Sequence, residues 1–116
     1  MAKKPVDDVA AVLEAIKGME PYQEIAKRVH QVIMESAPEL KPRLWYGMPG
    51  YAKAKSSPVI CFFRVDDYMT FGLTEKANVA RVENATDHLI PSAWFLTELD
   101  GPTEERIADI VKKAAS

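Results

Sequence analysis

The sequence has few of the residues on which reactive centres and crosslinks depend. It contains one cysteine, Cys61, and two histidines among 116 residues. An intramolecular disulfide is therefore excluded, and no short-spaced set of Cys and His ligands is available for zinc. The glycines are scattered singly, so a glycine-rich phosphate loop is absent as well. No motif in the sequence points to catalysis, and we assign no catalytic residue.

Long apolar runs and an excess of basic charge are also missing. No stretch approaches the roughly 20 apolar residues that a membrane-spanning helix needs. The apolar part of the N-terminal region carries Asp7, Asp8 and Glu14, which a secretory signal peptide would not. We therefore expect a cytoplasmic protein with no membrane partner. The formal net charge of −2 provides no domain-wide basic surface, which argues against nucleic acid as the main partner.

The residues that are present predict one α+β domain spanning residues 1–116. Apolar residues make up 47% of the chain and charged residues 28%, a balance typical of compact globular proteins. Helical periodicity and proline positions predict an N-terminal helical hairpin over residues 5–17 and 21–37. Short alternating segments then predict a mainly antiparallel sheet of about four to five strands. A C-terminal helix follows, with Thr103 as its expected N-cap, and residues 75–87 are interpreted as a short helix with a loop.

The two most apolar strand segments, residues 58–65 and 68–74, are expected to form a hairpin. A two-residue turn at Asp66-Asp67 would pair Phe62 with Phe71 and place both on the core face. The opposite face would then carry an apolar patch for a ligand, a protein partner or a homodimer, made of Cys61, Phe63, Val65 and Tyr68. A one-residue slip in the turn would exchange the two faces.

A basic and aromatic stretch is the first candidate binding region. No acidic residue occurs between Glu39 and Asp66, whereas five basic residues do. Aromatic rings beside cations bind anions, nucleotides or single-stranded nucleic acid, but the same rings can simply fill the core. A bend at Met48-Pro49-Gly50 is expected to bring the aromatic residues against the sheet. The candidate groove residues are Arg43, Trp45, Tyr46, Met48, Tyr51, Lys53 and Arg64.

Carboxylates on the first two helices form the second candidate region. Clustered carboxylates provide the hard oxygen ligands that divalent iron, manganese and magnesium accept. The alternative is an ordinary solvated helix surface, with Asp near a helix N-terminus favoured by the helix dipole. The candidate metal ligands are Asp7, Asp8, Glu14, Glu20 and Glu24.

The order of these segments resembles the YdhG-like domain family. The resemblance rests on a Pro-Glu pair that ends the second helix, followed by an aromatic, Gly-x-Pro and aromatic pattern; the matching residues are Pro38, Glu39, Trp45, Tyr46, Gly47, Pro49 and Tyr51. It implies a small intracellular α+β domain of frataxin-like outline. It also implies, from one relative described as an iron chaperone, a non-enzymatic carrier of Fe2+ that serves iron-cluster or haem assembly proteins.

Overall fold

The computed structural model describes residues 8–116, which form a five-stranded antiparallel sheet and three helices. The strands follow one another in sequence order across the sheet, so every sheet connection joins neighbours. The elements in chain order are α1 (Asp8–Lys17), α2 (Gln23–Ser36), β1 (Lys41–Trp45), β2 (Met48–Ala52), β3 (Val59–Val65), β4 (Met69–Leu73), β5 (Ala93–Leu96) and α3 (Gly101–Ala115). The expected α+β layout, with a helical pair first and a helix last, is confirmed.

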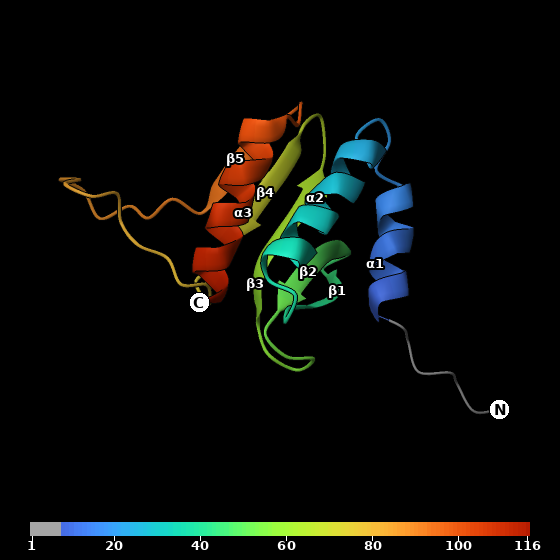
Figure 1. Cartoon of the computed structure of the whole chain (residues 1–116), viewed down its shortest axis with the longest axis horizontal. Coiled ribbons are helices and arrows are strands. Elements are labelled where there is room, and N and C mark those ends of the chain that lie inside the picture. The colour runs from blue at the N-terminus through green and yellow to red at the C-terminus, as the bar shows by residue number, and fades with distance from the viewer. Residues whose placement is uncertain (1–7) are drawn as a thin grey trace.

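All three helices lie on the same side of the sheet, which leaves the other side without a helix (Figure 1). Helix α2 buries the apolar stripe that its periodicity predicts, and α3 does the same. The apolar spacing of Val9, Leu13 and Ile16 predicts the buried stripe of α1, but the helix buries Val12 and Ile16, and Val9 and Leu13 are exposed. The largest side chains of the core are Tyr51, Phe63, Phe71, Ile33, Leu40 and Met69.

The hairpin between β1 and β2 turns at Tyr46 and Gly47. Both residues have positive φ angles, 51° and 79°, which is the backbone of a type I′ turn. Glycine adopts this conformation without a steric cost, and the twist of the turn matches that of the strands. The expected bend at Met48-Pro49-Gly50 is therefore wrong. These three residues belong to β2 and pair with β1.

The hairpin between β3 and β4 has a three-residue loop, Asp66 to Tyr68. The Asp66 amide donates to the Tyr68 carbonyl, and Val65 pairs with Met69. The expected pairing of Phe62 with Phe71 is thus wrong by one residue, and every β3 side chain faces the opposite way. Phe63 and Cys61 are fully buried beneath the helices, so the predicted apolar patch on the open face does not exist.

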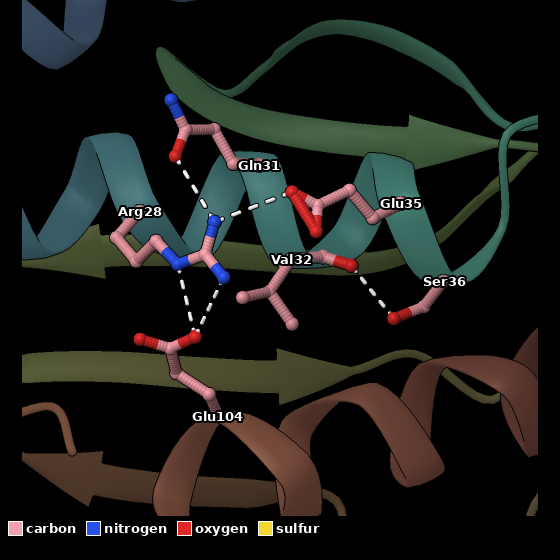
Figure 2. Close-up of polar contacts among 6 residues, drawn as sticks. All are labelled: Arg28, Gln31, Val32, Glu35, Ser36 and Glu104. Atoms are coloured by element: carbon pink, nitrogen blue, oxygen red, sulfur yellow. Dashed lines mark hydrogen bonds and ion pairs between the residues drawn. The ribbon is translucent and has the colours of Figure 1, made fainter. Parts of the chain in front are cut away.

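Helices α2 and α3 are joined by a polar cluster as well as by apolar contacts. Figure 2 shows the Arg28 guanidinium, from α2, donating two hydrogen bonds to one Glu104 oxygen of α3, at 2.9 and 2.7 Å. The same guanidinium reaches Gln31 and Glu35 of its own helix, each at 3.2 Å. Next to this cluster the Ser36 hydroxyl donates to the Val32 carbonyl. The guanidinium therefore links the N-terminal turn of α3 to the middle of α2.

Helix α3 begins earlier than expected. Asp100 is its N-cap, since one carboxylate oxygen accepts hydrogen bonds from the Thr103 amide and hydroxyl, at 3.0 and 2.5 Å. The prediction of Thr103 as the N-cap is wrong, and Thr103 lies within the first turn. Two hydrogen bonds from Thr103 hold the pKa of Asp100 below its usual value. The bond from the hydroxyl is the larger cause, and the bond from the amide is the smaller one.

Residues 75–92 connect β4 to β5 without forming the predicted short helix. The segment begins and ends on the body, because the Asn78 amide donates to the Ala114 carbonyl and the Leu73 amide donates to the Ser92 carbonyl. Between these points residues 80–90 extend away from the body, past the β5 side of the sheet (Figure 1). We call residues 80–90 the arm. Within residues 8–116 no helix is long and apolar enough to cross a membrane.

Candidate functional site

The side of the sheet without helices, here called the open face, is defined by strand register. One row across it runs from Arg43 through Gly50 and Phe62 to Gly72. The neighbouring row includes Trp45 at one end and Phe95 at the other. Among the strand residues on this face three are basic and none is acidic; the basic ones are Lys41, Arg43 and Arg64. The open face therefore combines aromatic rings with positive charge.

Aromatic side chains lie on the open face where glycines leave room for them. The Trp45 ring contacts Phe62, with centroids 5.2 Å apart, and Tyr46, with centroids 5.0 Å apart. A methyl group placed on Gly72 would come within 2.7 Å of the Phe62 ring, so the ring reaches over β4. Tyr46 is 85% exposed at the turn and extends the row of rings toward solvent. Two of these three aromatic residues, Trp45 and Phe62, border a hollow.

That hollow is a groove of about 370 Å³ between the open face and the loops beside it. Its walls include two cations, Arg43 from β1 and Lys76 from the segment after β4. The Arg43 Nη1 donates to the Lys55 and Ser57 carbonyls, at 2.9 and 2.7 Å, and so fixes the loop before β3. Within residues 8–116 no partner is assigned to its Nε and Nη2, which leaves donors for an anion. The complete lining is Arg43, Trp45, Pro58, Val59, Phe62, Leu73, Thr74, Glu75 and Lys76.

The seven predicted groove residues are divided among several places. Arg43 and Trp45 line the groove, and Tyr46 touches Trp45. Met48 and Arg64 border a separate cleft of about 220 Å³ near the end of α1, where Arg64 lies 3.6 Å from the Asp66 carboxylate. Lys53 reaches toward the C-terminal residue, its Nζ 3.5 Å from the Ser116 carbonyl. Tyr51 is fully buried on the helix-covered face, so it lines no part of this groove.

Among the groove residues that were not predicted, Phe62 and Lys76 were missed for identifiable reasons. The sequence prediction puts Phe62 in the core because it gives the loop after β3 two residues, whereas the loop has three. Lys76 lies in a segment that was interpreted as a short helix, and its position depends on tertiary contacts. The Thr74 hydroxyl accepts from the Lys76 amide and donates to the Val59 carbonyl, which holds this corner against β3. A Ser or Thr two residues before a turn amide is a local signal that sequence reading can use.

The predicted carboxylate ligands are not gathered into a metal site where the structure describes them. Asp7 lies outside the described residues. Glu14 makes an exposed ion pair with Lys17, at 3.4 Å, within α1. Glu20 borders the cleft near Met48, and Glu24 is exposed at the start of α2. Within residues 8–116 no group of three Asp, Glu, His or Cys side chains is placed to hold a metal ion.

Three titratable side chains meet in the core instead. His30 Nδ1, from α2, lies 2.7 Å from the Tyr51 hydroxyl, and Cys61 is the strand neighbour of Tyr51. Burial lowers the pKa of His30, raises that of Tyr51 well above its usual value and raises that of Cys61 to about 12. Tyr51 and Cys61 are fully buried, so a substrate cannot reach them. The cluster stays in its neutral forms and serves the core.

Comparison with known proteins gave no match to a family model, a curated protein or a solved structure.

Proposed function

We propose that this protein is a non-enzymatic binding module that takes a flat, anionic small molecule, such as a nucleotide, in the groove of its open face. The observation that carries the proposal is the meeting of Trp45 and Phe62 with Arg43 and Lys76 around one hollow. Binding is favoured over catalysis because His88 lies in the arm, Arg64 lies on the open face, and Tyr51 and Cys61 are buried where a substrate cannot reach them.

The aromatic side chains supply the flat surface. Trp45 is half-buried, and its contacts with Phe62 and Tyr46 hold its ring in place before any ligand arrives. A ring that is already ordered loses little conformational entropy when a second ring stacks on it. Stacking of a base on an aromatic side chain contributes about 1–3 kcal/mol.

The cations supply the charge complement. Arg43 is fixed by two backbone carbonyls, so its remaining N–H groups are oriented in advance. A guanidinium binds phosphate or carboxylate through parallel hydrogen bonds. Lys76 is exposed on the other wall, where its ammonium group adds a mobile positive charge. Glu75 on the same wall disfavours ligands with a high negative charge.

The size of the groove separates a small molecule from a polymer. A volume of about 370 Å³ lies at the lower end of the range of small-molecule sites, roughly 300–1,000 Å³. Single-stranded nucleic acid needs a basic track several nucleotides long. Beyond the groove the open face meets the acidic loop residues Asp66 and Asp67, and the whole chain carries a net charge of −2. We therefore favour a mononucleotide-sized ligand over an oligonucleotide.

Calorimetric titration tests the proposal directly. Titrants are a purine and a pyrimidine nucleoside monophosphate, inorganic phosphate and a short single-stranded oligonucleotide. We expect the monophosphates to bind, phosphate alone to bind more weakly, and Trp45→Leu to weaken monophosphate binding about 5- to 100-fold through lost stacking. Lys76→Glu should also weaken binding. Lys27→Glu makes the same charge change at an exposed position of α2, away from the groove, and should leave binding unchanged.

Two results would contradict the proposal. One is an absence of heat with every titrant, and the other is monophosphate affinity that Trp45→Leu and Lys76→Glu leave unchanged. Tight oligonucleotide binding with weak monophosphate binding would replace the small molecule with single-stranded nucleic acid as the ligand.

The iron-carrier hypothesis drawn from the YdhG-like resemblance stays a prediction. The described helical carboxylates give it no three-residue site, and Asp7 lies outside the described residues. The same titration, run anaerobically with Fe2+ on wild type and Glu14→Gln, separates it from the groove proposal. Identical negligible heats would dispose of an iron site that involves Glu14, and with it the proposed partnership with iron-cluster or haem assembly proteins.

A further inference from the structure

The arm is built to stay ordered while it is almost entirely exposed. Arg81 Nη2 donates to the Ala85 and Asp87 carbonyls, and the Ala85 amide donates to the Val82 carbonyl. The Asp87 carboxylate accepts from the Leu89 amide, which closes a second turn. These bonds join the arm to itself and hold its shape. Even so, three aliphatic side chains of the arm are exposed: Val82 at 59%, Leu89 at 77% and Ile90 at 44%.

The arm leaves the body beside the one sheet edge that lacks protection. The sheet has two edge strands, β1 and β5. Strand β1 reads KPRLW, and its Lys, Pro and Arg are the residues that prevent edge-to-edge pairing. Strand β5 reads AWFL, with neither charge nor proline, and its Phe95 is 68% exposed. An edge that is left apolar while the opposite edge is protected is expected to be covered by a partner.

An apolar groove of about 370 Å³ runs between this edge strand and α3. Trp94 and Leu96 of β5 form one wall, Ile107 and Ile110 of α3 form the other, and Arg106 lies at its border. The arm does not fill the groove of its own chain, because it points outward past β5 (Figure 1). One chain therefore carries an apolar arm and an apolar groove that it does not itself bring together.

We propose that the partner is a second copy of this chain, bound through paired β5 edges with the two arms exchanged. A two-fold axis places β5 antiparallel to its own copy, which extends the sheet without a new strand type. The same axis puts each arm on the β5–α3 groove of the other copy. Both arms are then buried and both grooves are filled in one closed dimer. Charge supports this seating, since the charged side chains of the arm, Arg81, Glu83 and Asp87, leave it one net negative charge and the groove border carries Arg106.

Concentration-dependent sedimentation measures the dimer. We expect a species of twice the 13.0 kDa chain mass to form as the concentration rises from micromolar to millimolar. Phe95→Lys on the β5 edge and Leu89→Asp on the arm should each weaken dimerisation at least about tenfold, because each places a charge in the contact. Tyr46→Lys, an equally drastic change at the β1–β2 turn on the far side of the sheet, should leave dimerisation unchanged. Both residues changed in the test are exposed, and matching circular dichroism spectra will show that the variants fold.

Disulfide trapping tests whether the arms are exchanged. Copies with Leu89→Cys are mixed with copies carrying Arg106→Cys under mild oxidation, and a disulfide between the two copies is expected. Native Cys61 is buried and does not compete. The pair Tyr46→Cys and Arg106→Cys is the control and should give no crosslink.

Three outcomes would overturn the proposal. A strict monomer at millimolar concentration excludes the second copy and points to an extended peptide of another protein on the β5 edge. A dimer that is insensitive to both charged substitutions uses a different surface. A dimer that Phe95→Lys weakens without any Leu89–Arg106 crosslink pairs its edges but does not exchange its arms.

Discussion

At the scale of single residues, Gly50 and Gly72 allow the aromatic rings to lie directly on the open face. A methyl group on Gly50 would come within 2.9 Å of the Trp45 Cβ and 3.1 Å of Val59, and one on Gly72 within 2.7 Å of the Phe62 ring. Both positions have ordinary strand φ angles, so space rather than backbone conformation favours glycine. The two obstacles differ, because the Trp45 Cβ moves only with its backbone whereas the Phe62 ring can rotate.

Alanine substitutions should distinguish these two glycines. We expect Gly50→Ala to lower the free energy of unfolding by about 1–3 kcal/mol, the usual cost of overpacking a rigid site. Gly72→Ala should cost less, because Phe62 can turn away, but the displaced ring should change ligand binding in the groove. Urea unfolding measures the first effect and titration the second. Gly101→Ala is the control, since open space surrounds Gly101 at the start of α3. Equal costs at Gly50 and Gly72 would contradict this reasoning.

The groove residues Arg43, Trp45 and Phe62 show why the site is only partly predictable from the sequence. The basic and aromatic stretch includes Arg43 and Trp45, which line the groove, and it could be recognised because charge and ring type are visible in sequence. The face of Phe62 depends on the loop after β3, and a two-residue turn at Asp66-Asp67 was a reasonable reading of its turn residues. The actual loop includes Tyr68, and this single residue moved Phe62 from the expected core to the groove.

At the scale of elements, the helices were predicted well and their ends less so. Apolar periodicity reflects burial directly, which is why α2 and α3 buried the expected stripes. A cap depends on one hydrogen bond, and both Asp100 and Thr103 were chemically suitable at the start of α3. Pro102 in the first turn is compatible with a helix that begins at Gly101, and that position makes Asp100 the cap.

The contact between α2 and α3 should depend on one carboxylate rather than on acidic charge in general. Glu104 accepts two bonds from Arg28, whereas Glu105 in the same turn is exposed. We expect Glu104→Gln to lower the urea midpoint and Glu105→Gln to change it much less, although both remove the same charge near the helix N-terminus. Because the Arg28 pair is partly exposed, high salt should reduce the difference. Equal midpoints for the two variants would mean that the Arg28–Glu104 bonds add no stability beyond the interaction of a carboxylate with the helix dipole.

At the scale of the whole molecule, sequence patterns described the body but not the arm. The body follows from periodicity, because each strand and helix buries a regular set of positions. The arm has no such pattern, and the short helix with a loop that is predicted over residues 75–87 does not form. Leu89 and Ile90 are instead exposed beyond the sheet edge. If the dimer forms, these two side chains are buried by a second copy of the chain. The apolar periodicity of a single sequence cannot predict such a contact.

The core sets the pH range in which the whole molecule is stable. His30, Tyr51 and Cys61 are all held neutral by burial. In the acid range the unfolded chain takes up a proton on His30 at its usual pKa of 6.5, while the folded state resists until a lower pH. Stability therefore falls as pH drops below 6.5. In the alkaline range the unfolded chain releases the Cys61 and Tyr51 protons first, so stability falls as pH rises above 9.

Most of the alkaline loss between pH 8 and pH 10 comes from the Cys61 thiol, because its ordinary pKa is lower than that of Tyr51. With a pKa of 9.0 in the unfolded chain and about 12 in the folded protein, Cys61 alone should lower the free energy of unfolding by about 1 kcal/mol between pH 8 and pH 10. Cys61→Ala should lower stability near neutral pH, where the packing of a buried side chain is lost, and should remove most of this slope, so the difference from wild type shrinks as pH rises from 8 to 10. Val111→Ala, which also truncates a fully buried side chain, should lower stability but keep the slope. Urea unfolding at closely spaced pH values gives all three profiles. A Cys61→Ala profile parallel to wild type would mean that the thiol ionises as readily in the folded core as in the unfolded chain, which burial among apolar side chains opposes.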